Sequence, residues 1–241
     1  MILRRITDAF RNQDWFTVAV ETLIVVLGVF LGLQVNNWNA ARMERQTGEQ
    51  LVQRLHEELT LSLAQEQTCV ERMEQYFTDA RDTYESLRSG EPGEGGEAAF
   101  RQQFAQIGPW TDLCIIRSTL DDLHAGRIAL VRDEEIKRII LQFHDDLEGT
   151  DTSIANLGGV HMQAMQEMYR EIDYDWKGEN RRLVSSFDEI SDNTAAVRSL
   201  GTTTFIFSTV LQYHRRANNE LQAVHQALAE YLGDNAGGEG R

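Results

Sequence analysis

Histidines are the side chains of this chain with the most scope for metal binding or proton transfer, and there are six: His56, His124, His144, His161, His214 and His225. Di-iron centres in helical bundles use a Glu-x-x-His motif on each of two helices. Here, only His124 follows an acidic residue, Asp121, at that spacing, and one half-site does not make a centre. No H-E-x-x-H or C-x-x-C-H motif for zinc or haem occurs. The sequence therefore predicts neither a metal site nor a cofactor.

The surroundings of three histidines favour structural roles. His144 precedes Asp145 and Asp146, but consecutive residues of a helix point in different directions, so we expect a solvated helix face there. His161 and His214 fall on apolar helix faces, where we expect hydrogen-bonded core residues. The alternative is a buried pair that responds to pH, because imidazole titrates near neutrality.

Motifs for nucleophilic catalysis and nucleotide binding are absent from the sequence. It contains no G-x-S-x-G elbow, no Walker loop and no dinucleotide fingerprint. The glycine-rich stretch 89–96 contains Glu91 and Glu94, whose charges repel phosphate, so we interpret it as a loop. The sequence predicts a protein that is not an enzyme.

The two cysteines, Cys69 and Cys114, lie beside core positions of separate predicted helices. In an oxidising compartment they could form a disulfide that ties these helices together. Two reduced and buried thiols are the alternative, because the adjacency of helices cannot be read from one sequence and disulfide geometry is demanding.

Four residues near the N-terminus could form a helix-packing face inside a membrane: Thr17, Glu21, Gly28 and Gly32. On a helix the last three lie within about 40° of one another, with Thr17 close by. A Gly-x-x-x-Gly pair lets a second helix approach closely, and an ionisable residue inside a membrane usually has a partner. We therefore expect a helix–helix contact. The alternative is that Glu21 reaches the lipid headgroups and the glycines have no special role.

These four residues lie in an apolar segment, Trp15 to Trp38, that predicts a transmembrane helix. As a helix this segment rises about 35 Å, enough to cross a hydrocarbon core of about 30 Å, with Trp15 and Trp38 anchored at the two interfaces. A cleaved signal peptide is the alternative. However, the leader 1–14 carries Asp8 and Asp14, and no small-x-small cleavage site follows the segment.

Charge is distributed unevenly along the chain. Residues 1–46 carry a net charge of +1 and the whole chain carries −15, so residues 47–241 carry −16. Such a domain repels nucleic acid and anionic headgroups, so no nucleic-acid partner is expected. Three arginines precede the apolar segment and two follow it closely, which favours a cytoplasmic N-terminus.

The whole sequence predicts an all-α fold, with one N-terminal transmembrane helix followed by an elongated helical bundle at residues 39–232. Apolar residues recur every three or four positions in four stretches, and proline is rare. The four stretches are 52–87, 112–124, 133–172 and 207–231.

Local signals divide these helices. Asp133 is a predicted N-cap, and segment 89–96 is a predicted loop. Gly158 and Gly159 predict a kink or break, because each glycine costs a helix about 1 kcal/mol relative to alanine. Residues 233–241 are a predicted disordered tail.

The run LGLQVNNWNAARMER, from Leu31 to Arg45, resembles the membrane-exit motif of a widespread bacterial family of small single-span proteins of unknown function. In that family an apolar helix ends in L-Q-[IV]-N-N-W-N and continues as a long charged helix. A second hallmark of the family is similar to Leu120–Phe143, although Ala125 replaces a usual Ser and His144 a usual aromatic. The resemblance implies an anchor in the bacterial inner membrane, a helical domain and no assigned activity.

These observations favour a membrane-anchored, non-enzymatic scaffold or accessory subunit of a membrane protein complex, with an acidic periplasmic bundle. Its partners would be the lipid bilayer and another membrane protein, or a second copy, contacted through the transmembrane face. The alternative is a periplasmic sensory bundle that binds a small ligand between its helices. That bundle would signal through a separate partner, because the leader 1–14 is too short for a signalling domain.

Overall fold

The structure, a computed structural model, describes residues 15–108, 110–177 and 180–238. Of these, the side chains of residues 15–18, 176–177, 180–181 and 234–238 are not described. The predicted leader 1–14 and the end of the predicted tail, 239–241, lie outside the described residues. The chain divides into two compact units, Met1–Glu49 and Gln50–Arg241, and each is considered by itself.

Helix α2 (Trp15–Ser89) begins in the first unit and contributes residues to both. In the first unit its apolar side chains are exposed, with Leu27 at 48% and Val35 at 65%. This helix contains an apolar stretch long enough to cross a membrane. The predicted N-terminal apolar helix is therefore confirmed, and its length and composition would allow it to cross a membrane.

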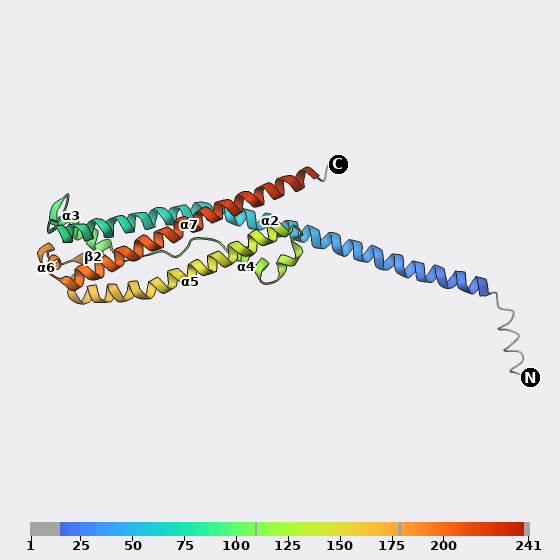
Figure 1. Cartoon of the computed structure of the whole chain (residues 1–241), viewed down its shortest axis with the longest axis horizontal. Coiled ribbons are helices and arrows are strands. Elements are labelled where there is room, and N and C mark those ends of the chain that lie inside the picture. Colours follow the sequence, from blue (N-terminus) through green and yellow to red (C-terminus); the bar gives the residue numbers. More distant parts are fainter. Residues whose placement is uncertain (1–14, 109, 178–179, 239–241) are drawn as a thin grey trace, which may run out of the picture. The chain divides into compact units, whose positions relative to one another are not determined.

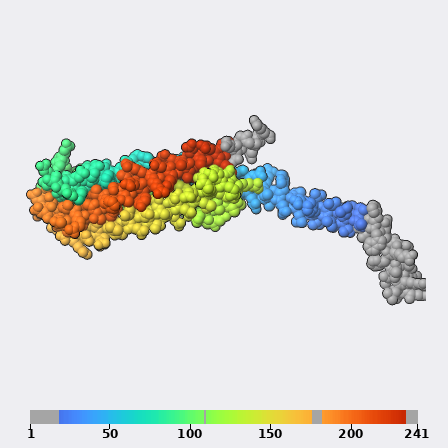
Figure 2. All heavy atoms as spheres, in the orientation of Figure 1, coloured from blue at the N-terminus to red at the C-terminus, as the bar shows by residue number. Residues whose placement is uncertain are grey.

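Three long helices build the second unit, as the all-α prediction requires. They are α2 from Gln50 onward, α5 (Glu134–Glu171) and α7 (Thr194–Gly238). Helices α5 and α7 pack against each other along the unit, as Figures 1 and 2 show. The side chain of Asp133 accepts a hydrogen bond from the Ile136 amide and caps α5, which confirms the predicted N-cap.

The apolar core of this unit consists of two clusters. One cluster includes Val70 and Met73 of α2 and Leu211 of α7. The other includes Leu59 of α2 and Ala217 of α7. Along both helices, polar residues separate the two clusters: Ser62 and Glu66 on α2, and His214 on α7, all with less than 1% exposure. We call these three residues the polar layer.

Shorter elements connect the long helices. They are α3 (Gly96–Gln106), α4 (Ser118–His124), the 3-10 helix η1 (Arg127–Leu130), α6 (Phe187–Ser191), and the antiparallel strands β1 (Tyr174–Lys177) and β2 (Asn180–Leu183). The predicted loop is present between the end of α2 at Ser89 and the start of α3 at Gly96. The β-hairpin was not expected from the sequence.

The structure corrects the predicted helix at 112–124, because only Ser118–His124 is helical. Residues 107–117 instead form a half-buried, non-helical connection between α3 and α4, which we call the strap. Pro109 is the one strap residue outside the described set. Apolar spacing at Leu113, Ile116 and Leu120 suggested a helix, but the strap's backbone groups find partners on neighbouring helices.

Two predicted helix boundaries also differ from the structure. Helix α5 continues without a break through Gly158 and Gly159. A Cβ at Gly158 would lie 3.0 Å from Cζ2 of Trp110, so this glycine makes room for the strap's tryptophan. Helix α7 extends to Gly238, beyond the expected end at 232, because the single Gly233 is too weak a breaker to stop it.

Candidate functional site

One face of α2 holds the strap and the start of α4 through side chains spaced at helical intervals. The Cys114 amide donates to Oε2 of Glu66 at 2.7 Å, and the Ile116 amide donates to Oγ of Ser62 at 2.9 Å. One turn further, the Thr119 amide donates to Oε2 of Glu58 at 2.9 Å. The strap therefore runs antiparallel to α2.

These contacts explain why residues 112–117 are stable without being helical. A half-buried backbone amide without a hydrogen-bond partner destabilises the fold, so a non-helical segment needs acceptors from elsewhere. Glu66 and Ser62 supply such acceptors from a helix about 50 residues earlier in the chain. Local periodicity carries no information about partners at that separation.

Glu58 provides the corresponding cap for α4, whose first turn has no cap from its own N-cap residue. Its carboxylate accepts hydrogen bonds from the Ser118 hydroxyl, the Thr119 hydroxyl and the Thr119 amide. Burial by itself raises the pKa of Glu58. The hydrogen bonds from Thr119 and Ser118 outweigh it, so the pKa lies below its ordinary value.

Glu66 and His214 form a fully buried pair at the centre of the polar layer. Nδ1 of His214 lies 2.7 Å from Oε1 of Glu66, and Nε2 lies 3.1 Å from the carbonyl oxygen of Thr111. A carbonyl only accepts hydrogen bonds, so Nε2 must carry a proton. The contact with Glu66 requires a second proton, on Nδ1 or on the carboxyl group. The pair therefore holds two protons and has no net charge.

His161 holds the strap from α5. Its Nε2 lies 2.9 Å from the carbonyl oxygen of Gly108, which requires a proton on Nε2. Nδ1 is buried and has no hydrogen-bond partner among the described residues. Trp110 stacks on the ring, with centroids 5.6 Å apart. Burial lowers the pKa of His161, and the bond to Gly108 opposes that shift only in part, so the ring is held neutral.

The expectations for His161 and His214 are thus confirmed as to burial and hydrogen bonding. The two histidines do not form a pair with each other. Each binds a different carbonyl of the strap, one from α5 and one from α7. In the sequence, Glu66 interrupts the apolar spacing of the stretch 52–87, but no local pattern indicates that His214 is its partner.

The structure joins Cys69 and Cys114 in a disulfide, with their Cα atoms 6.4 Å apart. Of the two alternatives left open by the sequence, the bonded state is therefore the one observed. Cys69 follows Glu66 by one turn of α2, and Cys114 is the residue whose amide binds Glu66. The covalent bond and the buried hydrogen bond hold the strap at the same point.

The predicted membrane face lies on α2 in the first unit. Glu21 is exposed, and a Cβ at Gly28 or Gly32 would meet no described atom within 4 Å. The chain's own packing therefore does not require these glycines. Trp38 is 66% exposed, as an interfacial anchor would be in the isolated chain. Trp15 and Thr17 belong to the same helix, but their side chains lie outside the described residues.

Comparison of the chain with protein-family models, curated proteins and solved structures gives no match.

Proposed function

We propose that the protein is a membrane-anchored, non-enzymatic scaffold or accessory subunit of a membrane protein complex. The observation that supports the proposal is that the buried groups of the polar layer hold the strap in place. Ser62, Glu66 and His214 each have one buried polar atom that bonds to a backbone group of the strap. His161 binds the strap in the same way. Buried side chains that bind the strap in this way hold the bundle in one conformation, and a scaffold requires a fixed conformation.

The exposed apolar stretch of α2 supports membrane anchoring. A run of exposed aliphatic side chains of this length is unfavourable in water, whereas a bilayer buries it. Beyond the run, Trp38, Arg42 and Arg45 lie on one side of the helix, where a tryptophan and two cations suit a headgroup region. The resemblance of this exit segment to a bacterial single-span family points to the inner membrane.

The disulfide supports a periplasmic bundle. Disulfides persist in oxidising compartments and are rare in the cytosol. We therefore place the bundle on the periplasmic side and the N-terminus in the cytoplasm. Alkaline phosphatase fused after Arg241 should be active, and a fluorescent reporter that fails in the periplasm should be dark at the same position. The opposite pattern would refute this orientation.

The partner in this proposal is a transmembrane helix, of a second protein or of a second copy, seated on the face formed by Glu21, Gly28 and Gly32. Close approach of two helices in a bilayer depends on small residues at the contact. The double variant Gly28→Leu/Gly32→Leu should therefore lose association in a membrane-based assay. Glu21→Gln should have a large effect if the carboxylate pairs with a basic group, and a small one if it only accepts a hydrogen bond.

A matched control uses the positions next to each glycine. Val29→Leu and Leu33→Ile change side-chain shape away from the centre of the face, so association should persist. If these changes weaken association as much as the glycine changes, the face is not specific. If neither set has an effect, the span is an anchor without a partner, and the proposed contact is wrong.

A further inference from the structure

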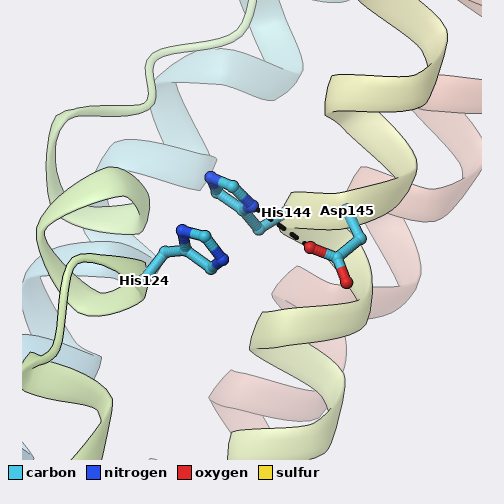
Figure 3. Close-up of side chains that lie close together, drawn as sticks. All are labelled: His124, His144 and Asp145. Atoms are coloured by element: carbon cyan, nitrogen blue, oxygen red, sulfur yellow. Dashed lines mark hydrogen bonds and ion pairs between the residues drawn. The ribbon is translucent and has the colours of Figure 1, made fainter.

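Two histidines from separate helices meet on the surface of the second unit. His124 lies in α4 and His144 in α5, and their rings stack with centroids 3.7 Å apart and planes within 12° (Figure 3). Asp145, the residue after His144, points back toward it, with Oδ1 3.4 Å from Nδ1 of His144. Asp121, one turn before His124, places Oδ1 3.7 Å from Nε2 of His144. The half-site Asp121–His124 thus faces the dipeptide His144–Asp145.

The donor atoms in this cluster lie at distances that a metal ion can bridge. One ligand atom from each of His124, His144 and Asp145 lies within 4.8 Å of the other two. Two donors of a tetrahedral zinc ion, each about 2.1 Å from the metal, are separated by about 3.4 Å. Side-chain rotations that move the donor atoms by up to about 1.4 Å would close the gap, and the side chains of His124 and Asp145 are exposed.

Charge also favours a cation at this cluster. Both ring nitrogens of His144 face a carboxylate, and its side chain is only 12% exposed. Imidazole nitrogens combined with carboxylate oxygens suit divalent first-row metals such as Zn²⁺. We propose that His124, His144 and Asp145 form a surface site for a divalent transition-metal ion that links α4 to α5, with Asp121 as a carboxylate partner of His144.

A second histidine pair shows that stacking alone does not create such a site. His56 of α2 and His225 of α7 also stack, with centroids 4.3 Å apart. Nε2 of His225 bonds to the Thr60 hydroxyl at 2.9 Å, so the polar neighbour there is a neutral side chain. In the described part of the chain, this pair belongs to no group of three or more candidate ligands. It therefore provides a matched control.

The test is a calorimetric titration of the full-length protein in detergent with Zn²⁺ alone. The protein should carry no polyhistidine tag and should first be freed of metal with a chelator. The expected result is saturable binding of one ion per chain and a rise in melting temperature with Zn²⁺, because the ion binds the folded state. Loss of an outer-shell partner weakens metal binding by roughly 10–100-fold. His124→Ala and Asp145→Asn each remove a direct ligand, so each should weaken Zn²⁺ binding by more than that.

His225→Ala should leave the Zn²⁺ affinity unchanged. Because His124 and Asp145 are exposed, their variants should fold, which circular dichroism can verify. Absence of saturable binding to the unmodified chain would overturn the proposal. Equal affinities in the unmodified chain, His124→Ala and Asp145→Asn would also overturn it, because binding would then lie elsewhere. Loss of binding in His225→Ala to the same extent as in His124→Ala would do so as well.

Discussion

Oε1 of Glu66 lies 2.7 Å from Nδ1 of His214, and neither side chain is exposed to solvent. The partners on the far sides of this pair, the Cys114 amide and the Thr111 carbonyl, both belong to the strap. Two long helices that are distant in sequence therefore meet at one short segment. This arrangement divides the apolar core into two clusters and fixes the strap between the helices.

Substitution of Glu66 tests whether the pair acts through hydrogen bonds or through charge. Glu66→Leu leaves the Cys114 amide and Nδ1 of His214 without partners, and should reduce the free energy of unfolding by about 3–5 kcal/mol. In Glu66→Gln the amide oxygen can accept from Cys114 while the amide nitrogen donates to Nδ1 of His214. Chemical denaturation should therefore find Glu66→Gln within about 1.5 kcal/mol of the unmodified protein. Equal losses in both variants would contradict this account.

Reduction of the disulfide should destabilise the bundle. The bond closes a loop of 45 residues, which corresponds to about 4 kcal/mol in the chain-entropy model. A reductant should lower the melting temperature and shift the mobility on a non-reducing gel. The variant Cys69→Ala/Cys114→Ala should melt at a lower temperature and be insensitive to reductant. Labelling of both thiols in unfolded but unreduced protein would rule out the bond.

Adjacent glycines in α5 should respond oppositely to alanine. At Gly158 a Cβ would lie 3.0 Å from Cζ2 of Trp110, and the resulting overpacking should cost about 1–3 kcal/mol. At Gly159 a Cβ meets no described atom within 4 Å, so Gly159→Ala should stabilise the helix by about 0.5–1 kcal/mol. Thermal unfolding of both variants checks the prediction. A stabilising Gly158→Ala would show that Trp110 does not pack there as described.

Acidification should weaken the contact made by His161. Burial holds its pKa below the ordinary value of 6.5, so the unfolded chain binds a proton more readily than the folded one. The stabilisation is therefore fully present above about pH 6.5 and is lost as the pH falls through the folded-state pKa. His161→Phe removes the titrating group. The difference in unfolding free energy between the unmodified protein and His161→Phe should shrink from about pH 7.5 to about pH 5. A constant difference would contradict the prediction.

Local signals predicted much of the fold. The apolar run that begins at Trp15, the cap at Asp133 and the repeated apolar seams all act within a few residues, so one sequence contains them. The polar residues His161 and His214 fall on the apolar faces of their helices. Their burial and hydrogen bonding follow from their helical positions.

Contacts between distant segments could not be predicted in this way. Residues 112–117 carry a helical apolar pattern, yet acceptors on α2 hold their amides in a non-helical conformation. In the sequence Gly158 suggests a break in the helix, and only the structure shows that Trp110 packs against it. Likewise, Asp121–His124 is half a metal site in sequence, and only the packing of α4 on α5 brings His144 to it.

We propose that this chain is an anchored scaffold whose transmembrane helix packs against a partner helix. The most direct test is purification in a mild detergent followed by native mass spectrometry, with the unmodified chain and Gly28→Leu/Gly32→Leu compared. The expected result is a membrane-spanning partner, or a second copy, in fixed stoichiometry with the unmodified chain. That partner should be lost from the double glycine variant and retained by Val29→Leu. The opposite result is a monomer that retains a small organic molecule in its bundle, with the same mass in the unmodified chain and in both variants. That result would contradict the proposed scaffold and favour a sensory domain.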